Sequence, residues 1–322
     1  MPADTTVLAL FRDVEDEALA AEVMTEVPDV IRILTGDNPA SALEYLKILG
    51  ITPRLAIASS RLYPAEKPEL VRQLRTLFPG TEILLMSSDT DPVPPLQPLA
   101  ADKVGHLVIN PASGRRSDKE KSQQHFVTAL KKLVNGGEWE IGEYLKPGSR
   151  IHTCHISSST QKEELIAMVE SAIEGSSPET DLLRQRGALL VDEMLENAVY
   201  NAPRKDDGSK MFRKGELRSI DPREGITFRF GFDGETLAME MVDGWGSLSP
   251  DVVLHYLARN QANGGEWAET GGRGLFIIWR ILDHMHVKIT PGRQTVIGGH
   301  LKATSAMDLD TPRGFNISTA KN

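Results

Sequence analysis

Hydrophobic and polar residues alternate in a regular way along the first 134 residues. Short apolar runs, typical of buried strands, are separated by longer segments whose apolar residues recur at helical spacing. The predicted strands are 5–12, 30–35, 54–58, 82–86 and 106–109, and the predicted helices are 13–27, 39–49, 70–78 and 117–134. Strands that alternate with helices of this length predict an α/β fold, a doubly wound parallel sheet covered on both faces.

The second half of the chain has a different pattern, in which strands and helices do not alternate one by one. A hairpin is predicted over 225–243, because two alternating runs flank the turn residues Asp233-Gly234. The other predicted strands are 150–157, 287–290 and 295–298, and the predicted helices are 161–174, 179–200, 248–262 and 275–284. Glycines are dense over 263–274, which suggests a mobile lid.

The two patterns meet at a glycine-containing stretch. Asn135-Gly-Gly137 is a linker or helix-end signal, and a Lys-Pro-Gly turn follows at 146–148. We therefore predict two domains, 1–134 and 150–322, joined by a linker over 135–149.

Composition narrows the classes of function. The chain has 322 residues, a net charge of −9 and no dense run of Lys or Arg, so we expect neither nucleic acid nor membrane as a direct partner. Cys154 is the only cysteine, which excludes an intrachain disulfide and favours a cytoplasmic location. No stretch approaches the roughly 20 apolar residues of a membrane helix, and the N-terminus lacks a secretory pattern.

The order of elements over the first 134 residues resembles the receiver domain of bacterial response regulators. A receiver holds Mg²⁺ with acids after strand one, attacks phosphate with an Asp after strand three, and uses a hydroxyl and a Lys after strands four and five. In this chain Asp13, Ser59, Ser87 and Asn110 occupy these four places. The nucleophilic carboxylate and the Lys are missing, so we predict a pseudo-receiver that does not accept phosphate by the usual route. A doubly wound domain with no site is the alternative.

Three polar motifs in the second half suggest a ligand site. Glu193 and Asn197 lie four apart on the long helix, so they share one edge of its buried face. An amide oxygen suits Mg²⁺ and a carboxylate can act as a base, although satisfied polar groups at a helix edge would look the same. Asp243 ends a strand and runs into Gly-Trp-Gly, and Gly272-Arg-Gly274 precedes a helix, where free N–H groups favour an anion.

These motifs, in this order, resemble the GHKL ATPase fold of histidine kinases, gyrase, MutL and anti-sigma serine kinases. The motifs are Glu193-Met-Leu-Glu-Asn197-Ala198, Asp243-Gly-Trp-Gly246 and Gly272-Arg-Gly274-Leu275, and the resemblance covers about 150–304. It implies an α+β two-layer sandwich that binds ATP and Mg²⁺. Trp245 departs from the family pattern, which has glycine there, and the lid is short.

The resemblance also implies a role for each residue. Asn197 would hold Mg²⁺ and Glu193 would help activate the attacking hydroxyl. Asp243 would read the amino group of adenine, with Gly246 and Thr295 nearby. Gly272 and Gly274 would wrap the phosphates.

The kind of activity is less constrained than the fold. Neither His125 nor His155 lies in a two-helix segment with a following acid, so a serine/threonine protein kinase is favoured over a histidine kinase. The first hypothesis is therefore a bacterial two-component-type signal-transduction protein that binds ATP and phosphorylates a partner protein, under control of the pseudo-receiver. The alternative is a non-catalytic scaffold or anti-sigma-type interaction module. A homodimer is left open.

Two other classes lack support. Gly272-Arg-Gly274 does not follow a strand, and the first strand has no glycine fingerprint of a dinucleotide fold after it. No His or Cys spacing suits zinc.

Overall fold

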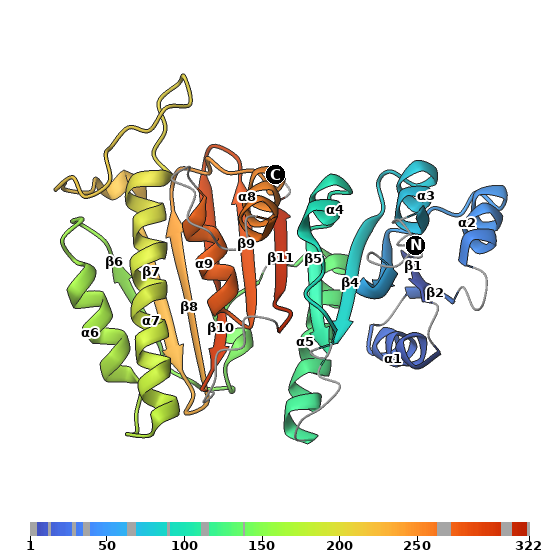
Figure 1. The fold of residues 1–322 in the computed structure, drawn as a ribbon, viewed down its shortest axis with the longest axis horizontal. Coiled ribbons are helices and arrows are strands. Elements are labelled where there is room, and N and C mark those ends of the chain that lie inside the picture. Colours follow the sequence, from blue (N-terminus) through green and yellow to red (C-terminus); the bar gives the residue numbers. More distant parts are fainter. Residues whose placement is uncertain are drawn as a thin grey trace. The chain divides into compact units, whose positions relative to one another are not determined.

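The chain divides into two compact units (Figure 1). The computed structural model describes residues 5–11, 14–27, 30–34, 39–62, 69–88, 91–110, 116–137, 139–262, 272–303 and 311–320. The first unit comprises 1–137 with 310–314, and the second comprises 138–309 with 315–322.

The first unit has a parallel sheet in the order β2-β1-β3-β4-β5. Its strands are β1 (Thr5–Leu10), β2 (Val30–Leu34), β3 (Leu55–Ser59), β4 (Glu82–Ser88) and β5 (His106–Asn110). Its helices are α1 (Val14–Thr25), α2 (Pro39–Ile48), η1 (Ser60–Leu62), α3 (Glu69–Leu77), α4 (Leu96–Ala101) and α5 (Arg116–Asn135). This strand order is that of flavodoxin and of receiver domains.

The apolar runs became strands because a parallel sheet covered on both faces buries both sides of every strand. All five residues of β3 are buried, and so are the five that follow Thr5 in β1. Helix α1 contacts α5, whereas α2 contacts α3. The predicted doubly wound α/β fold is confirmed for this unit.

The second unit has a sheet in the order β11-β9-β10-β8-β7-β6, with antiparallel pairing from β9 through to β6. Its strands are β6 (Ile151–His155), β7 (Thr227–Phe232), β8 (Thr236–Asp243), β9 (His284–Thr290), β10 (Gln294–Lys302) and β11 (Gly314–Thr319). Its helices are η2 (Ile141–Tyr144), α6 (Lys162–Ala172), α7 (Pro178–Glu196), η3 (Asn197–Asn201), η4 (Pro222–Glu224), α8 (Pro250–Ala262) and α9 (Arg273–Ile281).

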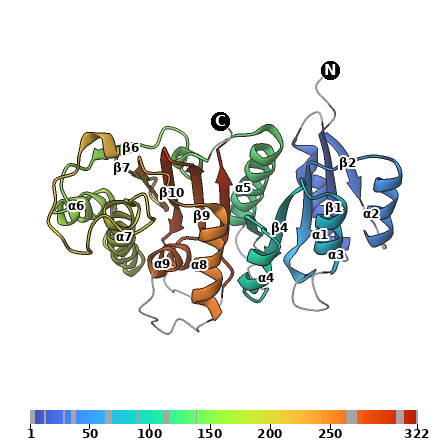
Figure 2. The same cartoon turned by 90° about the horizontal axis from the view of Figure 1, so that it is seen from above.

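Helices α6 to α9 lie on one side of this sheet (Figure 2). The alternation of side chains along β8 decides which residues face them. Leu237 and Met239 lie against α7 at Gly187, whereas Ala238 packs on Ile141 on the other face. Asp243 has the same parity as Leu237, so its side chain faces the helical layer.

The segment expected to be a linker belongs to the second unit. η2 contacts β7, β8 and β10, and Ile141 is fully buried against Ala238. The glycine and proline signals around it mark the ends of a short helix that packs on the sheet, so the predicted linker 135–149 is too long.

None of the helices in the described ranges combines the length and the apolar character that a membrane crossing requires.

Candidate functional site

The first wall of the site is the C-terminal end of α7. Ser177 caps the helix by accepting a hydrogen bond from the Thr180 N–H, and Pro178 occupies the first turn, where a missing N–H costs nothing. The helix ends in η3, a π-helical turn in which the Ala202 N–H donates to the Asn197 carbonyl at 2.7 Å. Such turns widen a helix locally and are frequent at functional sites.

The second wall is Asp243, the last residue of β8. It pairs directly with Thr295 of β10, and its Oδ1 accepts a hydrogen bond from the Trp245 N–H at 2.9 Å. Its side chain is buried, and burial raises the pKa of the carboxyl from 3.8 to about 6, while backbone hydrogen bonds from Trp245, Gly246 and Thr295 oppose the rise. A buried carboxylate with a pKa close to neutral is typical of a binding site.

The third wall is the start of α9. Gly272 is left-handed, with φ +91°, and a Cβ there would overlap the ring of Tyr256. A Cβ on Gly274 would lie 2.7 Å from Glu193 Oε2 and 3.2 Å from Asn197 Nδ2. Both glycines are therefore needed so that α9 can approach α7 and α8 closely. Gly271 and the predicted lid up to it lie outside the described residues.

These walls enclose a cavity of about 160 Å³ within the second unit. The cavity is lined by Asn197, Asn201, Ala202, Arg204, Lys210, Asp243, Leu248, Tyr256, Gly272, Leu275 and Ile297. Of the predicted site residues, Asn197, Asp243 and Gly272 therefore line one cavity. Thr295 and Gly246 lie beside Asp243. Gly274, on α9, lies against the side chains of Glu193 and Asn197 at the end of α7.

Three buried polar atoms at the site lack a hydrogen-bond partner among the described residues. They are Asn197 Nδ2, Thr295 Oγ1 and Trp245 Nε1. Because buried polar groups are nearly always paired, each such atom points to a ligand or water. The described residues include no cluster of three His, Cys, Asp or Glu side chains suited to a metal. Mg²⁺ is commonly held by one or two protein oxygens together with phosphate and water, and Asn197 fits that requirement.

Glu193 lies one turn before Asn197 and is half-buried. Burial is the main cause that raises the pKa of its carboxyl, and Glu196 adds to the rise, while Lys214 and Arg273 oppose it. Lys214 ion-pairs with Glu196 at 2.6 Å. A carboxyl whose pKa is shifted toward neutral is suited to take up a proton.

The departure at Trp245 leaves the turn after β8 intact. A Cβ on Gly244 would lie 2.6 Å from the Glu224 carbonyl oxygen, and Gly246 is left-handed with φ +57°. The backbone therefore needs glycine on either side of Trp245. Trp245 itself supports Asp243 through its N–H, and Gly246 accepts a hydrogen bond from the Gly292 N–H at 3.0 Å.

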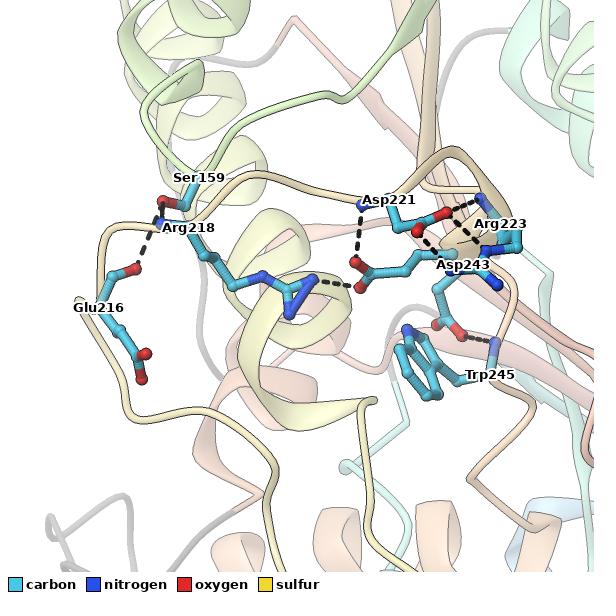
Figure 3. A network of polar contacts seen from close by, with 8 residues as sticks. Ser159, Glu216, Arg218, Asp221, Arg223, Asp243 and Trp245 are labelled. Atoms are coloured by element: carbon cyan, nitrogen blue, oxygen red, sulfur yellow. Dashed lines mark hydrogen bonds and ion pairs between the residues drawn. The ribbon is translucent and has the colours of Figure 1, made fainter.

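A polar network fixes this turn from the side of η4 (Figure 3). Arg218 ion-pairs with Glu224, and both side chains are largely buried. The backbone carbonyl of Glu224 accepts a hydrogen bond from the N–H of Gly244, next to Asp243, at 2.6 Å. Arg218 also lies over the ring of Phe212 at 3.7 Å and donates its N–H to Ser159 at 3.0 Å. The network anchors the end of the long loop 202–221 beside the cavity.

In the first unit, the structure describes three of the four predicted receiver positions, and Asp13 lies outside the described residues. Ser59 and Ser87 are buried at the ends of β3 and β4, and Asn110 ends the neighbouring β5. Another carboxylate lies beside these strand ends. Asp91 accepts hydrogen bonds from the Ser88 N–H at 2.8 Å, from Ser87 Oγ at 3.4 Å and from Arg61 Nε at 2.9 Å.

This arrangement predicts that the first unit does not take phosphate from a small donor. Incubation with acetyl phosphate and Mg²⁺ is expected to leave its mass unchanged, because a serine hydroxyl is a weaker nucleophile than the carboxylate that a receiver uses. Intact-mass spectrometry checks this, with a receiver that keeps its Asp and Lys as the positive control. A phosphoryl adduct on the peptide that contains Ser59 would contradict the prediction.

Sequence reasoning missed several residues that line the cavity. Asn201, Arg204 and Lys210 follow the helix motif on η3 and the next loop, and Tyr256 comes from the middle of α8. The one signal that could have found the first three is the length of the loop 202–221, because structureless loops this long are usually functional. Nothing in the local sequence singles out Tyr256.

No protein-family model matches this chain, and the comparison with curated proteins gives no match either. Solved structures of response regulators resemble it. RcsB of Salmonella typhimurium aligns at 11% identity over 58% of this chain and 91% of RcsB, with a TM-score of 0.31. LqsR of Legionella pneumophila aligns at 9% identity over 94% of this chain and 89% of LqsR, with a TM-score of 0.30.

A further RcsB structure, bound to promoter DNA, aligns at 12% identity over 64% of this chain and 96% of that chain, with a TM-score of 0.27. These TM-scores lie below 0.5, so the likenesses support no conclusion about what this chain binds. The receiver-like strand order of the first unit rests on the topology alone.

Proposed function

We infer that the second unit binds Mg-ATP in the cavity between α7, α9 and the end of β8, and that the chain is a signal-transduction protein. The receiver-like order of the first unit supports the signalling class. The proposed protein kinase activity, on Ser or Thr of a partner, rests on Glu193 and on the resemblance of the motifs to the anti-sigma serine kinases.

One observation carries the nucleotide proposal. Residues from three motifs that are far apart in the sequence, Asn197, Asp243 and Gly272, line the same cavity. The chemistry at each wall fits a different part of a nucleotide. A buried carboxylate can accept a hydrogen bond from the amino group of adenine, and an amide oxygen can ligate Mg²⁺. The N-terminus of a helix that begins at a glycine can bind phosphate through its free N–H groups.

The unpaired polar atoms at the site support the same proposal of nucleotide binding. Thr295 is fully buried next to Asp243, and its hydroxyl would find a partner in a ring nitrogen of the base or in a water between them. Asn197 Nδ2 would find one in a phosphate oxygen.

Isothermal titration calorimetry with Mg-ATP tests the binding step, and GTP serves as the matched ligand. GTP presents a carbonyl where adenine presents its amino group, and a carbonyl facing the Asp243 carboxylate is repelled. We therefore expect ATP to bind at least about tenfold more tightly than GTP, as a lost charged hydrogen bond predicts. Equal binding of both nucleotides, or of neither, would contradict the role assigned to Asp243.

The catalytic step is tested separately with Glu193→Gln. We expect transfer of phosphate from ATP to a partner protein or to water to fall about 10³-fold, in the range of a lost general base. Mg-ATP affinity should stay nearly unchanged, because glutamine keeps the size and polarity of the Glu193 side chain and removes only its charge. The measurement is release or transfer of labelled phosphate, with Glu163→Gln on α6 as the control. Binding of Mg-ATP without any turnover in the wild type would favour the non-catalytic scaffold.

A further inference from the structure

Two cations line the cavity on the loop that follows η3. Arg204 and Lys210 face each other through an isolated β-bridge, and both line the cavity. Arg204 donates to the Gly208 carbonyl at 3.4 Å, and Lys210 donates to Asn201. Within the described part of the chain, neither is ion-paired with a carboxylate. In a protein with a net charge of −9, two such cations at one cavity imply an anionic ligand.

A chain of hydrogen bonds connects this loop to the predicted Mg²⁺ ligand. Lys210 Nζ donates to Asn201 Oδ1 at 2.6 Å, and Asn201 Nδ2 donates to Asn197 Oδ1 at 3.1 Å. Asn197 and Asn201 are the first and last residues of the π-helical turn, and side chains four residues apart on a helix are neighbours. The Asn197 amide oxygen is thereby held in one orientation, and its second lone pair remains available to a cation.

The groups that line the cavity differ in charge according to the element they come from. The carboxylate of Asp243 comes from the sheet, and the cations come from the loop 203–210. A ligand with a hydrogen-bond donor on one part and several negative charges on another would satisfy both sets of groups. The chemical class that fits is a nucleoside polyphosphate, whose phosphates would lie toward the loop.

We propose that Arg204 and Lys210 form the polyphosphate subsite of this cavity, and that Asn201 is a positioning residue for Asn197. This proposal rests on the proposed nucleotide binding and makes it more specific. The loop cations set the preference for a triphosphate over a monophosphate, whereas Asp243 sets the preference for the base. Neither cation belongs to the three motifs of the sequence.

Calorimetric titration with Mg-ATP, ADP, AMP and adenosine, at constant ionic strength, tests the subsite. The wild type is expected to bind ATP more tightly than AMP. Lys210→Ala and Arg204→Ala should each weaken ATP binding by about tenfold to a hundredfold, the effect of losing one charge-assisted hydrogen bond. Neither variant should change the affinity for adenosine, which has no phosphate.

The control is Lys205→Ala, which removes the same charge from the same loop at a position that is also exposed but does not line the cavity. It should leave all four affinities unchanged, and Lys210→Arg should retain most of the ATP affinity. If Lys205→Ala and Lys210→Ala weaken ATP equally, the effect is general electrostatics and the subsite is rejected. If the wild type binds neither ATP nor adenosine, the proposed function itself falls.

Asn201→Ala tests the positioning role through the dependence on Mg²⁺. The ratio of ATP affinity with Mg²⁺ to that with chelator should fall about tenfold or more, as when an outer partner of a metal ligand is lost. Adenosine affinity, which needs no metal, should stay the same. A variant that weakens ATP and adenosine alike would show that Asn201 only supports the fold, and would overturn this part of the proposal.

Discussion

Asp243→Asn is expected to abolish most of the nucleotide affinity and, at the same time, to remove a pH dependence from the stability of the free protein. The buried carboxylate accepts N–H groups from the backbone and would accept one more from the base. An amide presents a donor on one side, which opposes these donors. We expect ATP affinity to fall by about 100-fold, or about 3 kcal/mol, the upper range for a hydrogen bond to a charged group.

The stability effect follows from the raised pKa of Asp243. A folded-state pKa of about 6, above the ordinary 3.8, means that the folded state binds the proton more tightly than the unfolded state between these values. Stability is therefore full below pH 3.8 and falls as the pH rises to about 6, by about 3 kcal/mol at most. Asp243→Asn removes the titrating group, so the melting temperature of the variant should lack the fall that the wild type shows as the pH rises from 3.8 to about 6.

Thermal denaturation and ATP titration at a pH well above and well below 6 check both effects. Wild-type ATP affinity should weaken at the lower pH, because a protonated carboxyl accepts only an uncharged, weaker hydrogen bond from the base, and the variant should lack this dependence. The control is Asp206→Asn, which removes the same negative charge from an exposed residue of the loop 202–221 and should behave like the wild type. Unchanged ATP affinity in Asp243→Asn would remove Asp243 from the site.

Gly246→Ala is expected to be the most destabilising small substitution near the site. A Cβ there would overlap the Thr290 carbonyl oxygen and would lie 2.6 Å from the Arg293 nitrogen, and both are backbone atoms that cannot rotate away. The residue is also left-handed, with φ +57°. Together, overpacking and the strained backbone are expected to cost about 4 kcal/mol.

Gly292→Ala is the matched control for this prediction. Gly292 is also left-handed, with φ +67°, and lies in the turn that donates to Gly246, but a Cβ there meets nothing within 4 Å. It should cost only about 1 kcal/mol, from the backbone alone. Denaturant unfolding of the two variants separates the steric collision from the backbone strain. Equal losses in the two variants would show that the turn at Gly246 can relax.

Gly246→Ala should also weaken ATP binding. The turn that carries the N–H groups of Trp245 and Gly246 would have to move away from Asp243, and the carboxylate would lose part of its support. In this way the glycine acts on the site from outside the cavity.

Several features of the fold could be predicted from the sequence because they depend on local pattern. The five strands of the first unit follow from their apolar runs, and the hairpin of β7 and β8 follows from alternation around Asp233-Gly234. β11 was missed, because its six residues mix polar and apolar positions after a stretch without a clear pattern. The segment of η2 lies in the linker predicted from sequence, because its glycine and proline signals do not show that Ile141 is buried.

The candidate site could be predicted from the sequence only where the residues of one motif lie on the same helix or strand. Glu193 and Asn197 share a helical face by spacing alone, and Asp243 ends a strand by pattern alone. Their common cavity, and the pairing of Asp243 with Thr295, depend on the register of β8 with β10. Register between strands that are distant in sequence is set by packing of the whole sheet, which no local pattern contains.

The sequence by itself predicted two units of different architecture, a serine (Ser59) at the end of the third strand, and the three motifs of the second unit. Only the tertiary structure decided that those motifs line one cavity and that Arg204, Lys210 and Tyr256 join them. It also decided that Trp245 serves Asp243 through its backbone. The physical reason is that helices and strands arise from neighbours along the chain, whereas a cavity and its charge arise from contacts between distant segments.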